Sequence, residues 1–250
     1  MAGFKDHFSD RAAAYAAHRP SYPDALAAHL ARLAPGRGLA LDCGCGTGQL
    51  AQLLAGHFER VVATDASVEQ IGQAGVLPNL AFRVAPAEAS GLPPGSADLV
   101  TAAQAAHWFD LPAFYAEVRR VARPGAVLAL VSYGIPHLDG APGEVVAAFY
   151  RDLGPCWPPE RRHVEEGYRG LPFPFAELPQ PALAIERDRG LDDLVGYVAT
   201  WSAVAELERR GGASRVAAFR QALAEHWGDP ATRRRVTWPL SMRLGRVEAD

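Results

Sequence analysis

The stretch LALDCGCGTGQL, residues 39–50, is the part of the chain that decides the fold class. A short apolar run leads directly into Gly44, Gly46 and Gly48, and a second apolar pattern follows. A glycine-rich turn between a buried strand and a helix lets a ligand come close to the backbone, and doubly wound sheets use it to bind nucleotide-like molecules. The stretch therefore predicts an α/β domain with a nucleoside site after its first strand.

An alternation of strand and helix patterns continues outward from this stretch. Apolar runs that alternate with helical patterns are typical of a parallel sheet covered on both faces. We therefore predict a doubly wound, mostly parallel, seven-stranded Rossmann-like sheet. The strands expected in its first part are residues 39–43, 60–65, 79–85, 96–105 and 126–133, with helices over 48–58, 67–75 and 111–123.

Three segments are expected along the chain. Residues 1–133 combine two N-terminal helices, roughly 5–18 and 23–34, with the ligand-binding core. Residues 134–181 are rich in proline and are expected to form an irregular cap. Residues 182–250, with one long helix over 191–210 and a final strand over 234–247, are expected to complete the sheet and a substrate pocket.

Composition narrows the function classes. The net charge of −3 gives no basic surface for nucleic acid or anionic membrane. No apolar run approaches the ~20 residues that span a bilayer, and the start of the chain lacks a signal-peptide core. Cys43, Cys45 and Cys156 suit neither a disulfide framework nor a metal site. We expect a cytoplasmic protein without a metal, either a monomer or a homodimer, that acts on a small molecule.

Asp42, just ahead of the glycines, indicates the charge of the ligand. Two unit charges ~4 Å apart interact by roughly 4 kcal/mol at an effective dielectric constant of 20, so a carboxylate there repels a diphosphate and attracts an ammonium group. S-adenosylmethionine, a nucleoside with a cationic amino-acid tail, fits this site better than NAD. The glycine spacing also departs from the dinucleotide fingerprint G-x-G-x-x-G. Asp65 ends the second strand, where an acid can bind ribose hydroxyls, and Ala87 with Glu88 follows the third.

Four stretches together carry a family resemblance: LDCGCGTGQL, VVATDAS, PAEASGLP and VRRVARPGAVLAL. In order and spacing they resemble class I S-adenosylmethionine-dependent methyltransferases. YAAHRPSYP, TAAQAAHWFD, TWSAV and TWPLSMRLGR are similar to the branch that contains the yeast-type trans-aconitate methyltransferases.

The resemblance implies a set of cofactor-binding residues. It places Asp42, Gly44 and Gly46 around the methionine part of the cofactor and Asp65 at the ribose. The full implied set is Tyr15, Arg19, Asp42, Gly44, Gly46, Asp65, Ala66, Ala87, Glu88 and Gln104. Pro86 replaces the acidic or small polar residue that many relatives place before the Ala-Glu pair, so adenine recognition would depend on backbone groups and Glu88.

The acceptor chemistry stays open between two cases. If the acceptor carries a proton, His107 after the fourth strand is the best general-base candidate; the alternative is a packing or capping residue that only shapes the pocket beside Trp108. If the acceptor is a carboxylate, no base is needed, and Arg19 or Arg243 can clamp it. Trp108, Trp201 and Arg243 are the expected substrate-pocket residues. Two alternatives remain: a binding protein without turnover, acting as a sensor, and a nicotinamide-dependent oxidoreductase, which the glycine spacing and Asp42 disfavour.

Overall fold

The computed structural model describes residues 18–248. Its main sheet has seven strands in the order β3-β2-β1-β4-β5-β8-β6. β1 to β5 are parallel to one another, and β8 runs antiparallel to β5 and to β6. The strands are β1 (Leu39–Cys43), β2 (Arg60–Asp65), β3 (Leu80–Val84), β4 (Ala97–Ala103), β5 (Ala122–Tyr133), β6 (Ala176–Leu178), β7 (Ala184–Arg189) and β8 (Arg234–Arg246). The predicted doubly wound, mostly parallel seven-stranded sheet is confirmed, with β7 pairing to β8 off this path.

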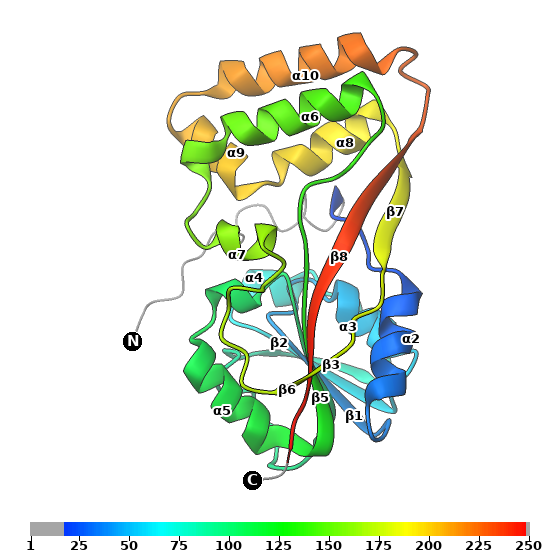
Figure 1. The fold of residues 1–250 in the computed structure, drawn as a ribbon, viewed down its shortest axis with the longest axis vertical. Coiled ribbons are helices and arrows are strands. Elements are labelled where there is room, and N and C mark those ends of the chain that lie inside the picture. The colour runs from blue at the N-terminus through cyan, green and yellow to red at the C-terminus, as the bar shows by residue number, and fades with distance from the viewer. Residues whose placement is uncertain (1–17, 249–250) are drawn as a thin grey trace.

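Helices cover both faces of the sheet, as Figure 1 shows. One face packs against α2 and α3, and the other packs against α5. The helices are α2 (Asp24–Leu33), α3 (Gln49–Leu54), α4 (Val68–Gly72), α5 (Leu111–Val121), α6 (Ala141–Asp152), α7 (Arg161–Glu165), α8 (Leu191–Ala199), α9 (Ser202–Arg209) and α10 (Ala213–Trp227). Two 3-10 turns are η2 (Ala106–Trp108) and η3 (Gly154–Cys156). No helix within residues 18–248 is both long enough and apolar enough to cross a bilayer.

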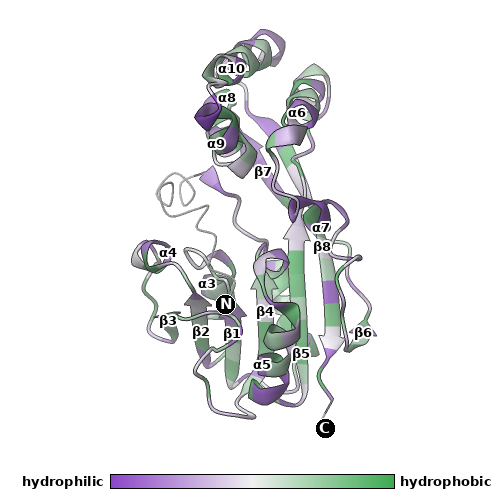
Figure 2. Ribbon diagram, turned by 90° about the vertical axis from the view of Figure 1, so that its left-hand side faces the viewer, coloured by the Kyte–Doolittle hydropathy of each residue, from purple (hydrophilic) through white to green (hydrophobic). Residues whose placement is uncertain are grey.

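Four helices, α6 and α8 to α10, form a helical layer beyond the carboxyl ends of the strands (Figures 1 and 2). Phe149 of α6 stacks on Phe219 of α10 with ring centroids 4.3 Å apart, which joins residues of the second and third predicted segments. This packing holds α6 and α10 together within the helical layer. The segment boundaries at 133/134 and 181/182 stay predictions, and most of the helix expected over 5–18 lies outside the described residues.

The single helix expected over residues 191–210 is wrong, because the chain forms α8 and α9 with a break between them. The Thr200 hydroxyl donates to the Tyr197 carbonyl at 2.6 Å, and Trp201 takes an extended backbone with ψ 135°. A hydroxyl that binds a carbonyl of the preceding turn competes with the next helical hydrogen bond. The break turns the Trp201 side chain into the core, where it is 4% exposed.

β8 joins the sheet to the helical layer. Its residues 240–246 pair with β5, whereas residues 234–239 pair with β7. Pro239 lies at the changeover, where its missing N–H costs no ladder bond to β5. Pro239 thus marks the point at which β8 changes its partner strand.

Candidate functional site

A cavity of about 710 Å³ opens at the carboxyl ends of β1, β2 and β4. This is the edge at which doubly wound sheets bind their ligands, and the volume lies within the ~300–1,000 Å³ of small-molecule sites. The wall contains every described residue of the implied cofactor set: Arg19, Asp42, Gly44, Gly46, Asp65, Ala66, Ala87, Glu88 and Gln104. His107 and Trp108 also line it. Tyr15 lies outside the described residues.

The glycine turn forms one wall of the cavity, and its glycines have left-handed backbone conformations. Gly44 has φ +64°, and a Cβ there would lie 2.5 Å from Cβ of Ala105. Gly46 has φ +56°, but an added Cβ would have no neighbour closer than 3.7 Å. Gly44 is therefore required by close packing, whereas the space beside Gly46 belongs to the cavity.

Asp42 lies at the floor of the cavity and is 1% exposed. The Thr101 hydroxyl donates to its Oδ1 at 2.6 Å, and its Oδ2 is buried without a hydrogen-bond partner among the described residues. Burial, with a smaller contribution from the negative charge of Asp65, raises the pKa of Asp42 to about 7. An unpaired buried carboxylate oxygen is costly unless a cation meets it, so the site fits a ligand with a positive group.

Asp65 at the end of β2 organises the same turn. Its Oδ2 accepts from the Gly46 N–H at 2.8 Å and its Oδ1 from the Ser67 N–H at 2.9 Å. Ser67 in turn is the N-cap of α4, and its hydroxyl accepts from the Gln70 N–H at 3.2 Å. The half-buried carboxylate thus faces the cavity while it fixes two loops that line it.

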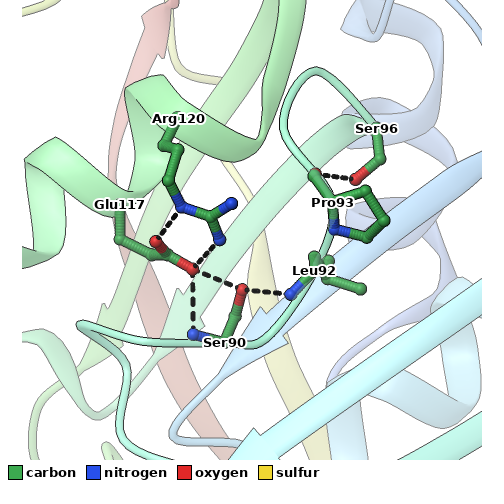
Figure 3. A network of polar contacts seen from close by, with 6 residues as sticks. All are labelled: Ser90, Leu92, Pro93, Ser96, Glu117 and Arg120. Atoms are coloured by element: carbon green, nitrogen blue, oxygen red, sulfur yellow. Dashed lines mark hydrogen bonds and ion pairs between the residues drawn. The ribbon is translucent and has the colours of Figure 1, made fainter.

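The loop after β3 carries Ala87 and Glu88, and a polar network fixes it to α5 (Figure 3). Ser90 donates to Glu117 Oε1 from its N–H at 2.9 Å and from its hydroxyl at 2.6 Å. Glu117 also binds Arg120, whose Nε and Nη2 lie 2.6 and 2.7 Å from its two oxygens. Despite burial, the bonds from Arg120 and Ser90 lower the pKa of Glu117. Glu88 Oε1 itself accepts from the Asp110 N–H at 2.9 Å, so this wall is preorganised.

Gln104 follows β4 with φ +58°, a left-handed conformation that is uncommon for a residue with a side chain. Its N–H donates to the Val131 carbonyl at 2.8 Å, and its Nε2 donates to the Tyr133 carbonyl at 2.7 Å. Such strain persists where the surrounding structure enforces it, which is typical of ligand sites. Both bonds hold Gln104 against β5 in the wall that the cavity shares with the recess described next.

A narrow recess of about 40 Å³ continues from the cavity toward the helical layer. It shares Arg19, Gln104, His107, Trp108 and Tyr133 with the cavity, and adds Trp157, Pro158, Arg161, Tyr197, Trp201 and Ser202. Trp201, which was expected in the substrate pocket, therefore lies in this recess and not in the larger cavity.

Two arginines define the chemistry of the recess. The Arg161 guanidinium lies 4.8 Å from the Trp157 ring, and Arg19 lies 5.6 Å from the Tyr197 ring. Arg161 forms no ion pair with a carboxylate of the described residues; its Nε donates to the Tyr150 hydroxyl at 3.1 Å. The recess thus combines positive charge with flat aromatic walls. Sequence reasoning missed Arg161, since its only signal was an arginine inside the aromatic and proline-rich stretch CWPPERR.

His107 lies on η2, where the cavity meets the recess. Its Nδ1 shares a hydrogen bond of 2.9 Å with the Tyr168 hydroxyl. Burial, assisted by the positive charges of Arg161 and His163, lowers the pKa of His107 to about 3. The ring is therefore neutral at physiological pH, and its weak basicity disfavours the general-base role considered from the sequence.

Arg243 does not reach the cavity or the recess, so the expectation that it lines the substrate pocket is corrected. Its guanidinium binds Glu177 and the carbonyls of Tyr168 and Leu171, at 3.2 and 3.0 Å. A residue of β8 can point to either face of the sheet, and this one faces the segment before β6 instead of the site. No group of three or more potential metal ligands occurs among residues 18–248.

Comparison with known proteins identifies the chain. Residues 41–130 match the family model of a methyltransferase domain. A Dictyostelium discoideum protein assigned as a methyltransferase is 33% identical over 213 residues, which cover 83% of this chain and 81% of that one. The chain is a class I S-adenosylmethionine-dependent methyltransferase.

Two further relatives agree with this identification. An Anaeromyxobacter dehalogenans structure, described as a type II methyltransferase, has 52% identity and a TM-score of 0.87, covering 93% of this chain and 99% of that one. A Saccharomyces cerevisiae protein assigned as an S-adenosylmethionine-dependent methyltransferase is 30% identical over 142 residues, 53% of this chain and 48% of that one. The protein is thus a methyltransferase whose methyl donor is S-adenosylmethionine.

The open space beside Gly46 gives a direct test of where the cofactor binds. In Gly46→Ala, the left-handed backbone costs about 1 kcal/mol of stability, and the new methyl group enters the cavity. We expect at least tenfold weaker S-adenosylhomocysteine binding by calorimetry. Gly95→Ala is the matched control, because Gly95 has φ +59°, nothing within 4 Å of an added Cβ and no contact with the cavity. Equal affinity in the two folded variants would place the cofactor elsewhere.

Proposed function

We propose that the methyltransferase methylates a small carboxylic acid on oxygen, and that a carboxylate of the acceptor enters the recess beyond Gln104 while the rest of the molecule lies in the adjoining cavity. The observation that carries this proposal is the Arg161 guanidinium, which faces the recess without a carboxylate partner among the described residues. Arginine presents a planar fork that matches a carboxylate, and stacking on Trp157 keeps that fork oriented. The resemblance to the trans-aconitate methyltransferase branch supports the same class of acceptor.

The proposed cofactor position follows from the residues of the cavity. Asp42 would meet the ammonium group through its unpartnered Oδ2, and the Gly44 to Gly46 backbone would follow the methionine chain. Asp65 and Ala66 would lie at the ribose, with Ala87 and Glu88 at the adenine and Arg19 near the methionine carboxylate. When bound there, S-adenosylmethionine supplies an electrophilic methyl group on a sulfonium.

The low basicity of His107 supports an acceptor that needs no deprotonation. A carboxylic acid is already ionised at neutral pH, so its oxygen can form the new bond to the methyl carbon as the sulfur–carbon bond breaks. The residues of the site then have to align the carboxylate and exclude water. Trp108, Trp157 and Trp201 would supply dry walls, and Arg161 would hold the acid in place. The products would be a methyl ester and S-adenosylhomocysteine.

A panel of mono-, di- and tricarboxylic acids, phenols and amines, assayed with methyl-labelled S-adenosylmethionine, tests this proposal. We expect label to enter acids as base-labile esters. Arg161→Gln should raise the KM of the acid at least tenfold and leave S-adenosylhomocysteine affinity unchanged. Arg162→Gln, which changes the exposed neighbouring arginine outside the recess, should behave as wild type. Transfer only to phenols or amines, or an unchanged KM in Arg161→Gln, would contradict the proposal, and no transfer to any compound would favour a sensor.

A further inference from the structure

Tyr168 connects the acceptor side of the cavity to a distant part of the sheet. It follows α7, is fully buried and does not line the cavity or the recess. Its hydroxyl lies 2.9 Å from His107 Nδ1, and the two rings lie 5.8 Å apart at 38°. The other ring nitrogen of His107 has no hydrogen-bond partner among the described residues and is not enclosed by them. His107 therefore turns one nitrogen to Tyr168 and the other to the open space.

The backbone that carries Tyr168 is strained. Gly167 and Tyr168 have φ +61° and +63°, two left-handed residues in succession. Glycine tolerates this conformation, but it costs a residue with a Cβ about 1–2 kcal/mol. A Cβ on Gly167 would lie 2.7 Å from Ser241 Oγ of β8, so the turn also packs tightly on the sheet. A strained tyrosine kept in a buried turn indicates that the placement of its side chain has a use.

Arg243 holds this strained turn in place. Its Nη1 donates to the carbonyls of Tyr168, Arg169 and Leu171 at 3.2, 3.4 and 3.0 Å. Its Nε and Nη2 bind the Glu177 carboxylate, and its guanidinium lies 4.6 Å from the Phe173 ring. The Arg243 side chain is 12% exposed, whereas that of Glu177 is 56% exposed, so the bonds to the turn are better shielded from water than the ion pair. One guanidinium thus donates to three carbonyls of the turn, among which that of Tyr168 also accepts from the Leu171 N–H at 3.1 Å.

We infer that Tyr168, fixed by Arg243, is a positioning residue that holds the His107 ring in one orientation and one tautomer at the edge of the methyl-transfer cavity. A neutral imidazole presents either an N–H or a lone pair, and the hydrogen bond at one nitrogen decides which group the other presents. The Tyr168 hydroxyl therefore sets the polar group that His107 offers to the acceptor. This inference rests on the proposed acceptor position, but its test measures the tautomer of the His107 ring directly.

The test is ¹⁵N–¹H correlation NMR of the ring nitrogens in histidine-labelled protein with S-adenosylhomocysteine bound, His107 being assigned from its loss in His107→Gln. Wild type should show two widely separated nitrogen shifts, as one neutral tautomer does. Tyr168→Phe removes only the hydroxyl and keeps the strained backbone, and we expect the two shifts to converge as the tautomers mix. Arg243→Gln should move them in the same direction, and Arg243→Lys less.

Tyr115→Phe is the matched control. Tyr115 is also a buried tyrosine, and its hydroxyl donates at 2.6 Å to the carbonyl of Pro172 in the segment that Arg243 binds, without touching His107. Its loss should leave the His107 shifts unchanged. Unaltered shifts in Tyr168→Phe, or an equal change in Tyr115→Phe, would overturn the inference. Unaltered shifts in folded Arg243→Gln and Arg243→Lys would overturn the part assigned to Arg243. The NMR measurement needs no acceptor, so a failed acceptor screen would contradict the proposed function without changing the His107 shifts.

Discussion

Asp65→Ala is expected to weaken S-adenosylhomocysteine binding at least a hundredfold. The side chain ends β2 at the cavity, so its loss removes the acceptor proposed for the ribose hydroxyls. It also frees the N–H groups of Gly46 and Ser67, which lie 2.8 and 2.9 Å from the carboxylate. Hydrogen bonds to a charged group contribute about 1.5–3 kcal/mol each, and a hundredfold loss corresponds to about 2.8 kcal/mol. Isothermal titration calorimetry measures the change.

Two comparisons separate this effect from simple unfolding. Asp65→Asn keeps one acceptor oxygen and the shape of the side chain, and we expect it to bind with intermediate affinity. Asp139→Ala changes an aspartate outside the cavity and should bind as wild type. Wild-type affinity in a folded Asp65→Ala protein would show that β2 does not contact the cofactor. Equal binding of NAD and S-adenosylhomocysteine by wild type would show that the charge of the ligand does not matter.

Asp42→Asn is expected to change how both cofactor binding and stability depend on pH. The pKa of Asp42 is about 7 in the folded protein, against an ordinary value of 3.8. Between these values the folded state holds a proton that the unfolded state has lost. Stability therefore falls as the pH rises from about 4 to about 7 and is constant above it. The variant cannot ionise, so without cofactor it should be more stable at pH 8, by up to about 4 kcal/mol.

The same ionisation predicts a proton released on binding. An ammonium group beside Asp42 favours the carboxylate, so at pH 6 the cofactor should displace close to one proton in wild type. Affinity should then fall up to tenfold for each pH unit below 7. In Asp42→Asn, the cofactor should bind weakly, and no proton should be released on binding. Calorimetry in buffers of different ionisation enthalpy counts the proton directly. Equal proton release in the two proteins would show that Asp42 does not meet the positive group.

That the described residues of the implied cofactor set line one cavity could be predicted from the sequence because the pattern is local, whereas their contact with the cofactor stays a prediction. Asp42, Gly44 and Gly46 belong to one strand and turn, and Asp65 ends the next strand, so a parallel sheet brings them to one edge whatever follows. The apolar runs that predicted β1 to β5 arise because strands of a parallel sheet are buried on both of its faces. Such continuous runs are easy to recognise in a sequence.

The acceptor side was harder because it depends on distant segments. Arg161, Trp201 and Gln104 line one recess only because α7 and the helical layer pack against the sheet, which no local pattern specifies. Arg243 could face either side of β8, and periodicity does not tell which side carries the site. The break at Thr200 was missed because a hydroxyl bond to Tyr197 overrides a good helical pattern.

The two pairings of β8 also imply an order of assembly. Residues 39–133 contain all five parallel strands, so this part can collapse through contacts between neighbours in sequence. The helical layer is joined to it by β8, which pairs with β5 only after more than a hundred further residues have been made. During synthesis, the segment that carries β1 to β5 should therefore become protected from proteases while the recess beside Trp201 is still unformed.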